Sequence, residues 1–250
     1  MIFLKNTFLI ALLLASVSLF AQKKDDHAKA DKIYDKLGYT EAIELYRQGK
    51  LDLASMERMA HGYRLNHDTY NAERWYAQVV SASEDPINLL HYAQACHSNG
   101  NFAKAKEFYL KYNQATGGSD KRGERLATAL DRQAEFSNKK GIEVKNAAAL
   151  NSEKLDFSPA LFENGVVFAS TREPEGAMKK LTKEKDAWTG DDFTNLYFAK
   201  ENGDGSLGKP EVFAADLGTR FHEGPLTFSR SGDQVFFTRN NVKNGGWSLL

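Results

Sequence analysis

The chain has 250 residues, enough for one or two domains with hydrophobic cores of their own. Lys and Arg together number 33, and so do Asp and Glu, so the formal net charge is zero; with no basic patch, this argues against a nucleic-acid partner. The single cysteine, Cys96, excludes an internal disulfide and a cysteine-based zinc site.

Residues 1–21 have the pattern of a secretory signal peptide. Lys5 supplies the positive charge, and the apolar run from Phe8 to Phe20 is shorter than the roughly 20 residues that a membrane-spanning helix needs. We expect cleavage after Ala21, where no cysteine is available for a lipid anchor. The chain is therefore expected to be exported and to keep no integral membrane span after cleavage; an uncleaved membrane anchor is the alternative.

A small-residue pattern recurs three times in the next section. In each copy, a second alanine follows the first after twelve residues, a tyrosine follows four residues later, and helix-breaking residues fall between the alanines. The copies, offset by 30 and then 33 residues, are Ala30, Ala42 and Tyr46; Ala60, Ala72 and Tyr76; and Ala93, Ala105 and Tyr109. Such a period is typical of stacked helical hairpins, in which alanine lets two helices cross closely and tyrosine fills the space toward the next hairpin. We expect residues 26–140 to form this domain, with an irregular helical bundle as the alternative.

The end of the helical section predicts a capping helix. Residues 121–139 carry Leu126, Leu130 and Phe136 at helical spacing, as in a helix that covers the last hairpin of a stack. The sequence does not show which residues face a partner. Four histidines lie in this section at spacings that do not suit a metal pair on one helix face: His61, His67, His91 and His97. We interpret them as solvated or core residues and predict no metal site.

From residue 141 the composition changes to a strand pattern broken by Gly, Asn, Ser and Asp. Two segments, 157–172 and 223–239, echo each other with a proline, an aromatic residue, a glycine turn, an apolar strand and an arginine. The matched positions are Pro159, Phe162 and Gly165 in the first segment and Pro225, Phe228 and Gly232 in the second. The pattern predicts β-hairpins that turn at Asn164-Gly165 and Ser231-Gly232, with second strands buried on both faces as in propeller blades.

These residues carry a family resemblance. The helical section resembles tetratricopeptide repeats, with Pro86 at the join after the second unit, and Pro225 to Thr238 resembles the repeat of TolB-like, WD40-like β-propellers. The order of signal, helices, DFSPALFENGVVFASTR and FHEGPLTFSRSGDQVFFTRNN is similar to a Bacteroidota family of OmpA-type envelope proteins, to which the peptidoglycan-tethering periplasmic component of the type IX secretion system belongs.

The resemblance implies an α-then-β architecture. A tetratricopeptide-like domain would be followed by an incomplete β-propeller over residues 141–250, of which only the first blades are present. It also implies a periplasmic location at the outer membrane, other envelope proteins as partners, and contact with peptidoglycan through a C-terminal domain that this chain lacks. We therefore expect the chain to be the N-terminal piece of a longer protein, or a truncated product.

Three chemical signals have simpler explanations. Gly203-x-Gly205-x-x-Gly208 matches a dinucleotide fingerprint, but Lys209-Pro210 follows it in place of a helix, so we expect a glycine-rich hairpin loop without a nucleotide site. The twelve-position calcium loop with its terminal glutamate cannot be aligned with this segment, so we expect no calcium site. Asp191-Asp192 is expected to be a solvated acidic loop. His222-Glu223 has no nucleophile motif to accompany it. We predict no catalytic, cofactor or metal residues.

Two functions from different classes remain. The first is a non-enzymatic scaffold of the cell envelope that binds partner proteins through its repeats. The alternative is the front part of a secreted hydrolase, in which the propeller would gate a peptidase domain further along the chain. The helical repeats favour the scaffold, because gating a peptidase does not require them; this preference rests on analogy between folds.

Overall fold

The computed structural model describes residues 27–133, 141, 143–175, 185–241 and 246–249. The chain divides into a helical unit, residues 1–142 with 187–189, and a strand unit, residues 143–186 with 190–250. The expected order, helical hairpins first and antiparallel sheets after them, is confirmed. The expected signal peptide and Phe136 of the capping helix lie outside the described residues.

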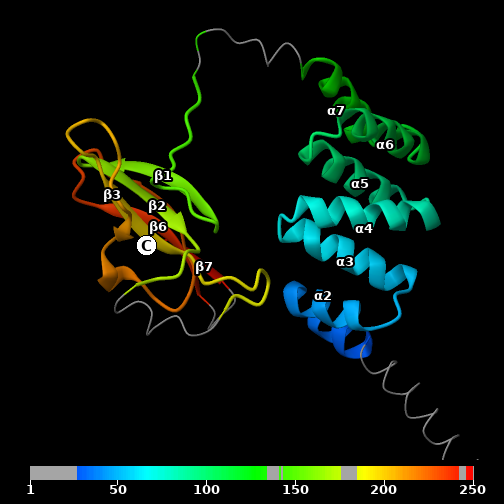
Figure 1. The fold of residues 1–250 in the computed structure, drawn as a ribbon, viewed down its shortest axis with the longest axis horizontal. Helices are drawn as coiled ribbons and strands as arrows, with labels where there is room; N and C mark the ends of the chain where they lie inside the picture. Colours follow the sequence, from blue (N-terminus) through cyan, green and yellow to red (C-terminus); the bar gives the residue numbers. More distant parts are fainter. Residues whose placement is uncertain (1–26, 134–140, 142, 176–184, 242–245, 250) are drawn as a thin grey trace, which may run out of the picture. The chain divides into compact units, whose positions relative to one another are not determined.

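The helical unit is a stack in which each helix packs on the next one in the chain (Figure 1). Residues 27–34 are helical and pair with α2 as the first hairpin. The later elements are α2 (Tyr39–Gln48), α3 (Leu53–Leu65), α4 (Thr69–Ala82), α5 (Pro86–Ser98), α6 (Phe102–Ala115) and α7 (Arg122–Asp131). Side chains of Asp52, Asp68 and Asp85 cap the first turns of α3, α4 and α5, and Pro86 is the first residue of α5, where its missing N–H costs nothing.

The three hairpin turns have the same hydrogen bonds. Each first helix ends in a residue with a left-handed backbone, and these residues are Leu37 (φ 66°), His67 (φ 59°) and Gly100 (φ 80°), which repeat the 30- and 33-residue offsets. At Gly100, its N–H donates to the His97 carbonyl and the next N–H, of Asn101, donates to the Cys96 carbonyl. This is the Schellman arrangement, and the corresponding bonds form at the other two turns.

Introducing glycine at one of these turns and removing it from another are expected to change the free energy of unfolding in opposite directions. His67→Gly should raise the free energy of unfolding by about 1 kcal/mol, because a side chain is strained at φ 59°. Gly100→Ala should lower it by about 1 kcal/mol, although an added Cβ there meets nothing within 4 Å. Denaturant unfolding followed by the helical circular dichroism signal measures both. Two changes of the same sign would contradict the shared turn geometry.

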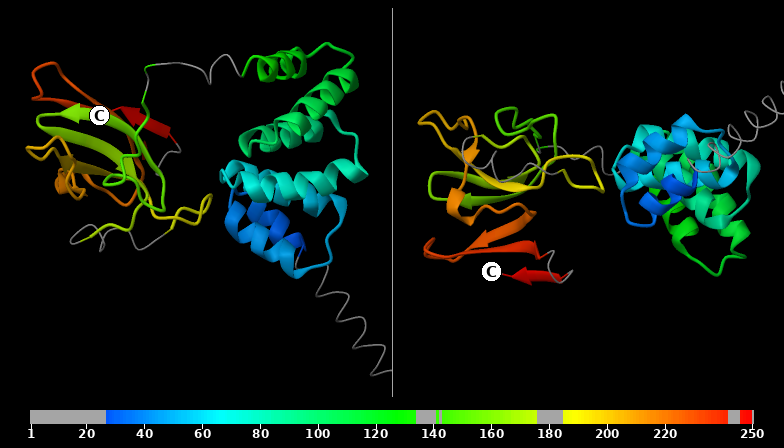
Figure 2. Two further views of the ribbon diagram at one scale, coloured as in Figure 1. Left: turned by 45° about the horizontal axis from the view of Figure 1, so that its top comes forward. Right: turned by 90° about the horizontal axis from the view of Figure 1, so that it is seen from below.

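The strand unit consists of two antiparallel sheets that lie in layers (Figure 2). The first sheet has the order β1-β2-β3-β4 and the second β5-β6-β7. The strands are β1 (Asp156–Phe162), β2 (Gly165–Ser170), β3 (Asn195–Lys200), β4 (Glu211–Val212), β5 (Glu223–Phe228), β6 (Val235–Asn241) and β7 (Gly246–Leu249), with a short 3-10 helix, η1 (Ala215–Leu217), before β5. β2 is almost wholly buried: Val167 and Ala169 pack toward Phe237 of the second sheet, and Phe168 packs on the opposite face.

The proline and aromatic positions of the two echoed segments occupy matching places in the two sheets. Pro159 and Pro225 each lie where the register of the first strand shifts, in a β-bulge, which tolerates a residue without an N–H. Phe162 and Phe228 end their strands, and their rings stack with centroids 4.3 Å apart. The repeated aromatic residue therefore packs against its own counterpart and joins the two sheets.

The glycines do not match in the same way: the predicted turn at Ser231-Gly232 is confirmed, and the one at Asn164-Gly165 is corrected. Gly232 has φ 76° and lies in a six-residue loop, Ser229 to Gln234. The first hairpin instead turns at Glu163 and Asn164, and Gly165 already belongs to β2, paired with Phe162. A Cβ on Gly165 would lie 2.4 Å from the Ala199 carbonyl oxygen. Gly165 is thus required by the close approach of β3, whereas Gly232 is suited to its turn.

Candidate interaction surface

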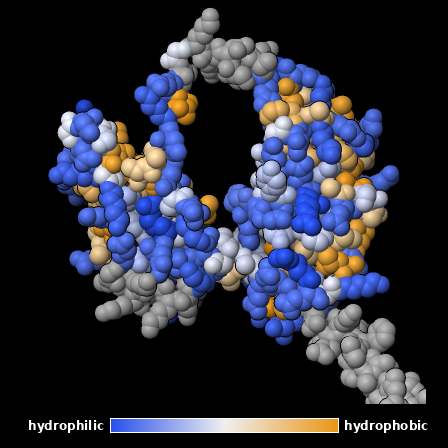
Figure 3. All heavy atoms as spheres, in the orientation of Figure 1, coloured by the Kyte–Doolittle hydropathy of each residue, from blue (hydrophilic) through white to orange (hydrophobic). Residues whose placement is uncertain are grey.

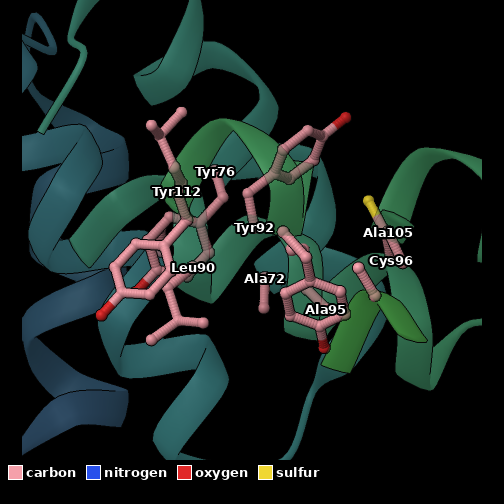
Figure 4. Close-up of a cluster of buried hydrophobic side chains, with 13 residues drawn as sticks. Ala72, Tyr76, Leu90, Tyr92, Ala95, Cys96, Ala105 and Tyr112 are labelled. Carbon is pink, nitrogen blue, oxygen red and sulfur yellow. The ribbon is translucent and has the colours of Figure 1, made fainter. Parts of the chain in front are cut away.

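The repeat positions singled out in the sequence lie in the core of the helical unit. All nine are at most 1% exposed: Ala30, Ala42, Tyr46, Ala60, Ala72, Tyr76, Ala93, Ala105 and Tyr109. Those of the first copy pack with Ile43 and Met59, and those of the later copies belong to one larger cluster, which Figure 4 shows around Tyr76, Leu90 and Tyr92. These side chains shape the stack and are not available to a partner.

The hydroxyl groups of the three repeat tyrosines reach polar partners on first helices. Tyr46 donates to Asp31 (2.5 Å), the Tyr76 hydroxyl lies 3.2 Å from His91 Nδ1, and the Tyr109 hydroxyl lies 3.3 Å from His97 Nδ1. Burial raises the pKa of Tyr76 and of Tyr109 to about 12, so both phenols are neutral at physiological pH. Each tyrosine therefore links the buried core to a polar face of the stack.

That polar face is formed by the first helices of successive hairpins. We call Tyr34, Arg58, His61, Arg64 and His91 the histidine row. Arg58, His61 and Arg64 are three residues apart on α3 and so share one face of it. The Tyr34 hydroxyl lies 2.5 Å from His61 Nδ1, the rings of His61 and His91 have centroids 6.2 Å apart, and the Arg58 guanidinium lies over the Tyr34 ring at 5.2 Å. The row thus crosses three helices.

Arginine charges set the electrostatics of the row. Arg58 forms an ion pair with Asp31 (2.5 Å), which offsets its charge. Arg64 has no such ion pair within the described part of the chain, and its Nε is buried there without a hydrogen-bond partner. Burial, and after it the charge of Arg64, lower the pKa of His61 and lower that of His91 to about 4. The row therefore combines two neutral imidazoles with one unneutralised guanidinium.

The pKa of His91 predicts a loss of stability in mild acid. The folded state resists protonation of His91. The contribution of this residue to the free energy of unfolding is therefore fully present above its unfolded pKa of about 6.5, and it is lost as the pH falls through about 4. The expected loss from this residue is about 2 kcal/mol. His91→Gln should reduce the slope of unfolding free energy against pH in that window. Equal slopes for wild type and His91→Gln would contradict this assignment.

The row continues into an open pocket beside the third repeat. The pocket, about 540 Å³, is lined by Gln94, His97, Ser98, Phe102 and Tyr109. By the 33-residue offset, Gln94 and His97 correspond to His61 and Arg64. The Phe102 ring is 38% exposed and meets the His97 ring edge-on. The pocket therefore offers an apolar ring beside hydrogen-bonding groups, which suits a peptide side chain better than a free ion.

The histidine row was not predicted from the sequence, because the histidine spacings were compared only with those of a metal pair on one helix. Metal or cluster spacing was sought along one helix, whereas His61 and His91 come together from neighbouring hairpins. Among the described residues, no group of three His, Cys, Asp or Glu side chains is placed to hold a metal ion. The usable signal was the repeat period itself, since it places the first helices side by side.

The weaker signals of the strand unit are also placed by the structure. The glycine fingerprint is a hairpin loop, as expected: Glu201 bridges to Leu207, and the Asn202 N–H donates to the Ser206 carbonyl. The expectation of a solvated acidic pair is wrong for Asp192, which is 6% exposed and pairs with Lys185 at 2.7 Å, an ion pair that permits its burial. Glu223 is buried at the start of β5.

Comparison with known proteins adds little to this geometry. No protein-family model matches the sequence, and no curated protein matches it. Among solved structures, the chain is similar to the tetratricopeptide domain of Sgt2 from Aspergillus fumigatus, with 18% identity and a TM-score of 0.38 over 50% of this chain and 87% of that one. A likeness this weak carries no argument, so the description of the helical unit rests on its own hairpins and turns. No helix in the described residues is long and apolar enough to span a membrane.

Proposed function

We propose that the protein is a non-enzymatic scaffold whose helical unit, a tetratricopeptide-like stack, binds a segment of a partner protein along the histidine row. One observation carries the proposal: hydrogen-bonding and aromatic side chains continue across successive first helices, from Tyr34 through His61 to His91 and on to the pocket at His97. Stacked hairpins generate extended binding surfaces of this kind. The row holds donors, acceptors and rings, which suit the polar backbone and side chains of a peptide.

The cellular setting is part of the same proposal. The signal-like N-terminus supports export to the periplasm, and the echoed strand segments support the first blades of a TolB-like or WD40-like propeller. The family resemblance supports partners in the outer-membrane envelope, and attachment to peptidoglycan through a downstream OmpA-like domain. Fractionation of the envelope with an antibody against the helical unit tests this setting. Recovery of the native protein in the cytoplasm would contradict it.

Site-specific photocrosslinking in the native cells tests the binding face. A photoreactive residue at exposed Gln94, beside the row, should give a protein adduct of discrete mass. The matched position is exposed Glu107 on α6, outside the row. A second variant, Arg64→Ala, should weaken the Gln94 adduct, because it removes the unneutralised charge of the row. A discrete adduct from Glu107 with none from Gln94 would assign binding to another face.

Exposed apolar side chains elsewhere on the helical unit provide a further comparison. Figure 3 shows hydrophobic patches among the mainly hydrophilic surface of this unit. Tyr70 on α4 and Leu110 on α6 are 81% and 44% exposed. Crosslinking from these positions that equalled crosslinking from Gln94 would mean nonspecific adhesion, and the proposal would fail.

A further inference from the structure

Two buried oxygen atoms in the strand unit lack hydrogen-bond donors within the described residues. One is Oε2 of Glu223, at the start of β5. The side chain is 1% exposed, and its other oxygen, Oε1, accepts bonds from the Thr219 N–H (3.1 Å), the Thr219 hydroxyl (2.6 Å) and Arg239 Nε (3.1 Å). All of these donors bond Oε1, so Oε2 is left without a donor among the described residues.

The second oxygen is Oδ1 of Asn195, at the start of β3 in the other sheet. Asn195 is also 1% exposed. Its amide nitrogen, Nδ2, donates to the Phe193 carbonyl (3.0 Å), and this bond determines which end of the amide is the oxygen. A rotated amide would lose that bond, so Oδ1 is an acceptor without a donor.

Both side chains line the same small cavity. Its volume is about 10 Å³, and the rest of its lining includes Leu196, Val212, Phe213, Leu217 and Gly218. A space of roughly 10–15 Å³ is what one water molecule needs, and a buried water is stable when two to four polar partners surround it. Leaving two acceptors buried without a donor is unfavourable, because each loses its hydrogen bonds to solvent.

We propose that one water molecule occupies this cavity and donates one hydrogen to Glu223 Oε2 and the other to Asn195 Oδ1. The water joins β3 of the first sheet to β5 of the second, at the layer boundary where Phe162 stacks on Phe228. Two other occupants fit less well. A calcium ion prefers six to eight oxygen ligands. A monovalent cation would be repelled by the Arg239 guanidinium, whose Nε lies 3.1 Å from the same carboxyl group.

A direct hydrogen bond from a protonated Glu223 to Asn195 is the main competitor. Burial raises the pKa of Glu223, whereas its bonds to Thr219 and Arg239 oppose that rise. Infrared difference spectra in heavy water separate the two cases. With the water in place, Glu223 is ionised at neutral pH, and Glu223→Gln should remove no protonated-carboxyl band. A protonated-carboxyl band at neutral pH that disappears in Glu223→Gln would overturn the proposal.

A crystal structure of the full chain, at a resolution that shows ordered water, gives the direct test. We expect one peak within about 2.7–3.2 Å of both Oε2 and Oδ1. An empty cavity, direct contact of the two side chains, or a peak surrounded by further ligands at metal distances would each overturn the proposal.

A double-mutant cycle keeps the proposal testable without crystals. Asn195→Ala and Glu223→Ala each remove one of the two acceptors of the water, so their effects on the unfolding equilibrium constant should be non-additive by roughly two- to tenfold. Glu223→Ala paired with Asn202→Ala, in the exposed hairpin loop, should be additive. An additive result for the Asn195 pair would contradict a shared water.

Discussion

Replacing Tyr76 with alanine is expected to lower the free energy of unfolding of the helical unit by about 4 kcal/mol. Tyr76 is 1% exposed and belongs to the largest buried cluster, with Ala72, Leu90 and Tyr92 around it (Figure 4). Removing a buried aromatic ring loses its transfer free energy and leaves a cavity, which together cost roughly 3–5 kcal/mol. Because the alanines around the ring are short, few neighbouring side chains can move in to fill the space.

Two matched variants separate the ring from its hydroxyl and from its helix. Tyr76→Phe keeps the ring and loses the contacts of the hydroxyl with His91 Nδ1 and Arg64, so about 1 kcal/mol is expected. Tyr70→Ala, on the same helix but 81% exposed, should stay within about 0.5 kcal/mol of wild type. Denaturant unfolding of the full chain, followed by its helical circular dichroism, measures all three. If Tyr76→Ala were no worse than Tyr70→Ala, the repeat tyrosines would not hold the hairpins together.

The repeat period explains how much of the helical unit could be predicted. Alanine and tyrosine at constant offsets reveal which positions are buried, because the same hairpin is built three times from the same local rules. The left-handed residues at the turns also follow the period, although only Gly100 is a glycine, the residue type that favours this conformation. Leu37 adopts the same left-handed conformation, although nothing about leucine as a residue type favours it.

The histidine row could not be predicted in the same way. His61 and His91 are not at equivalent repeat positions, and they meet only because two first helices approach each other in space. The polar character of each residue is visible in the sequence, but its neighbours are set by packing. The same limit applies to Glu223 and Asn195, since their buried oxygens come from different sheets. A single sequence does not show which residues far apart in the chain come into contact.

Glycine in the strand unit shows a different limit. Gly165 and Gly232 look alike in two echoed segments, yet one meets the carbonyl of Ala199 and the other adopts φ 76° in a loop. The second hairpin has a longer loop than the first, and that shifts the alignment of its second strand. Glycine therefore occurs at the matched position for two different physical reasons, the close approach of another strand in one copy and the backbone conformation in the other.

Replacing Gly123 with alanine is expected to destabilise the helical unit by about 2–3 kcal/mol, opposite in sign to the usual effect of this change inside a helix. Alanine is favoured over glycine in a helix by about 1 kcal/mol. A Cβ on Gly123 of α7, however, would lie 2.5 Å from the Tyr109 carbonyl oxygen and 2.9 Å from the Tyr112 ring on α6. Backbone cannot move aside as a flexible side chain can, so α7 would have to shift away from α6.

Gly62→Ala on α3 is the control, because its Cβ would meet mainly the flexible end of the Ile43 side chain at 3.0 Å. There the gain in helix propensity and a small movement of Ile43 should nearly cancel, leaving the unfolding free energy within about 1 kcal/mol of wild type. Unfolding curves of both variants in the full chain provide the comparison. Stabilisation by Gly123→Ala would mean that α7 does not pack closely on α6. In that case the last hairpin would not be covered, and the capping function expected for this helix would be lost.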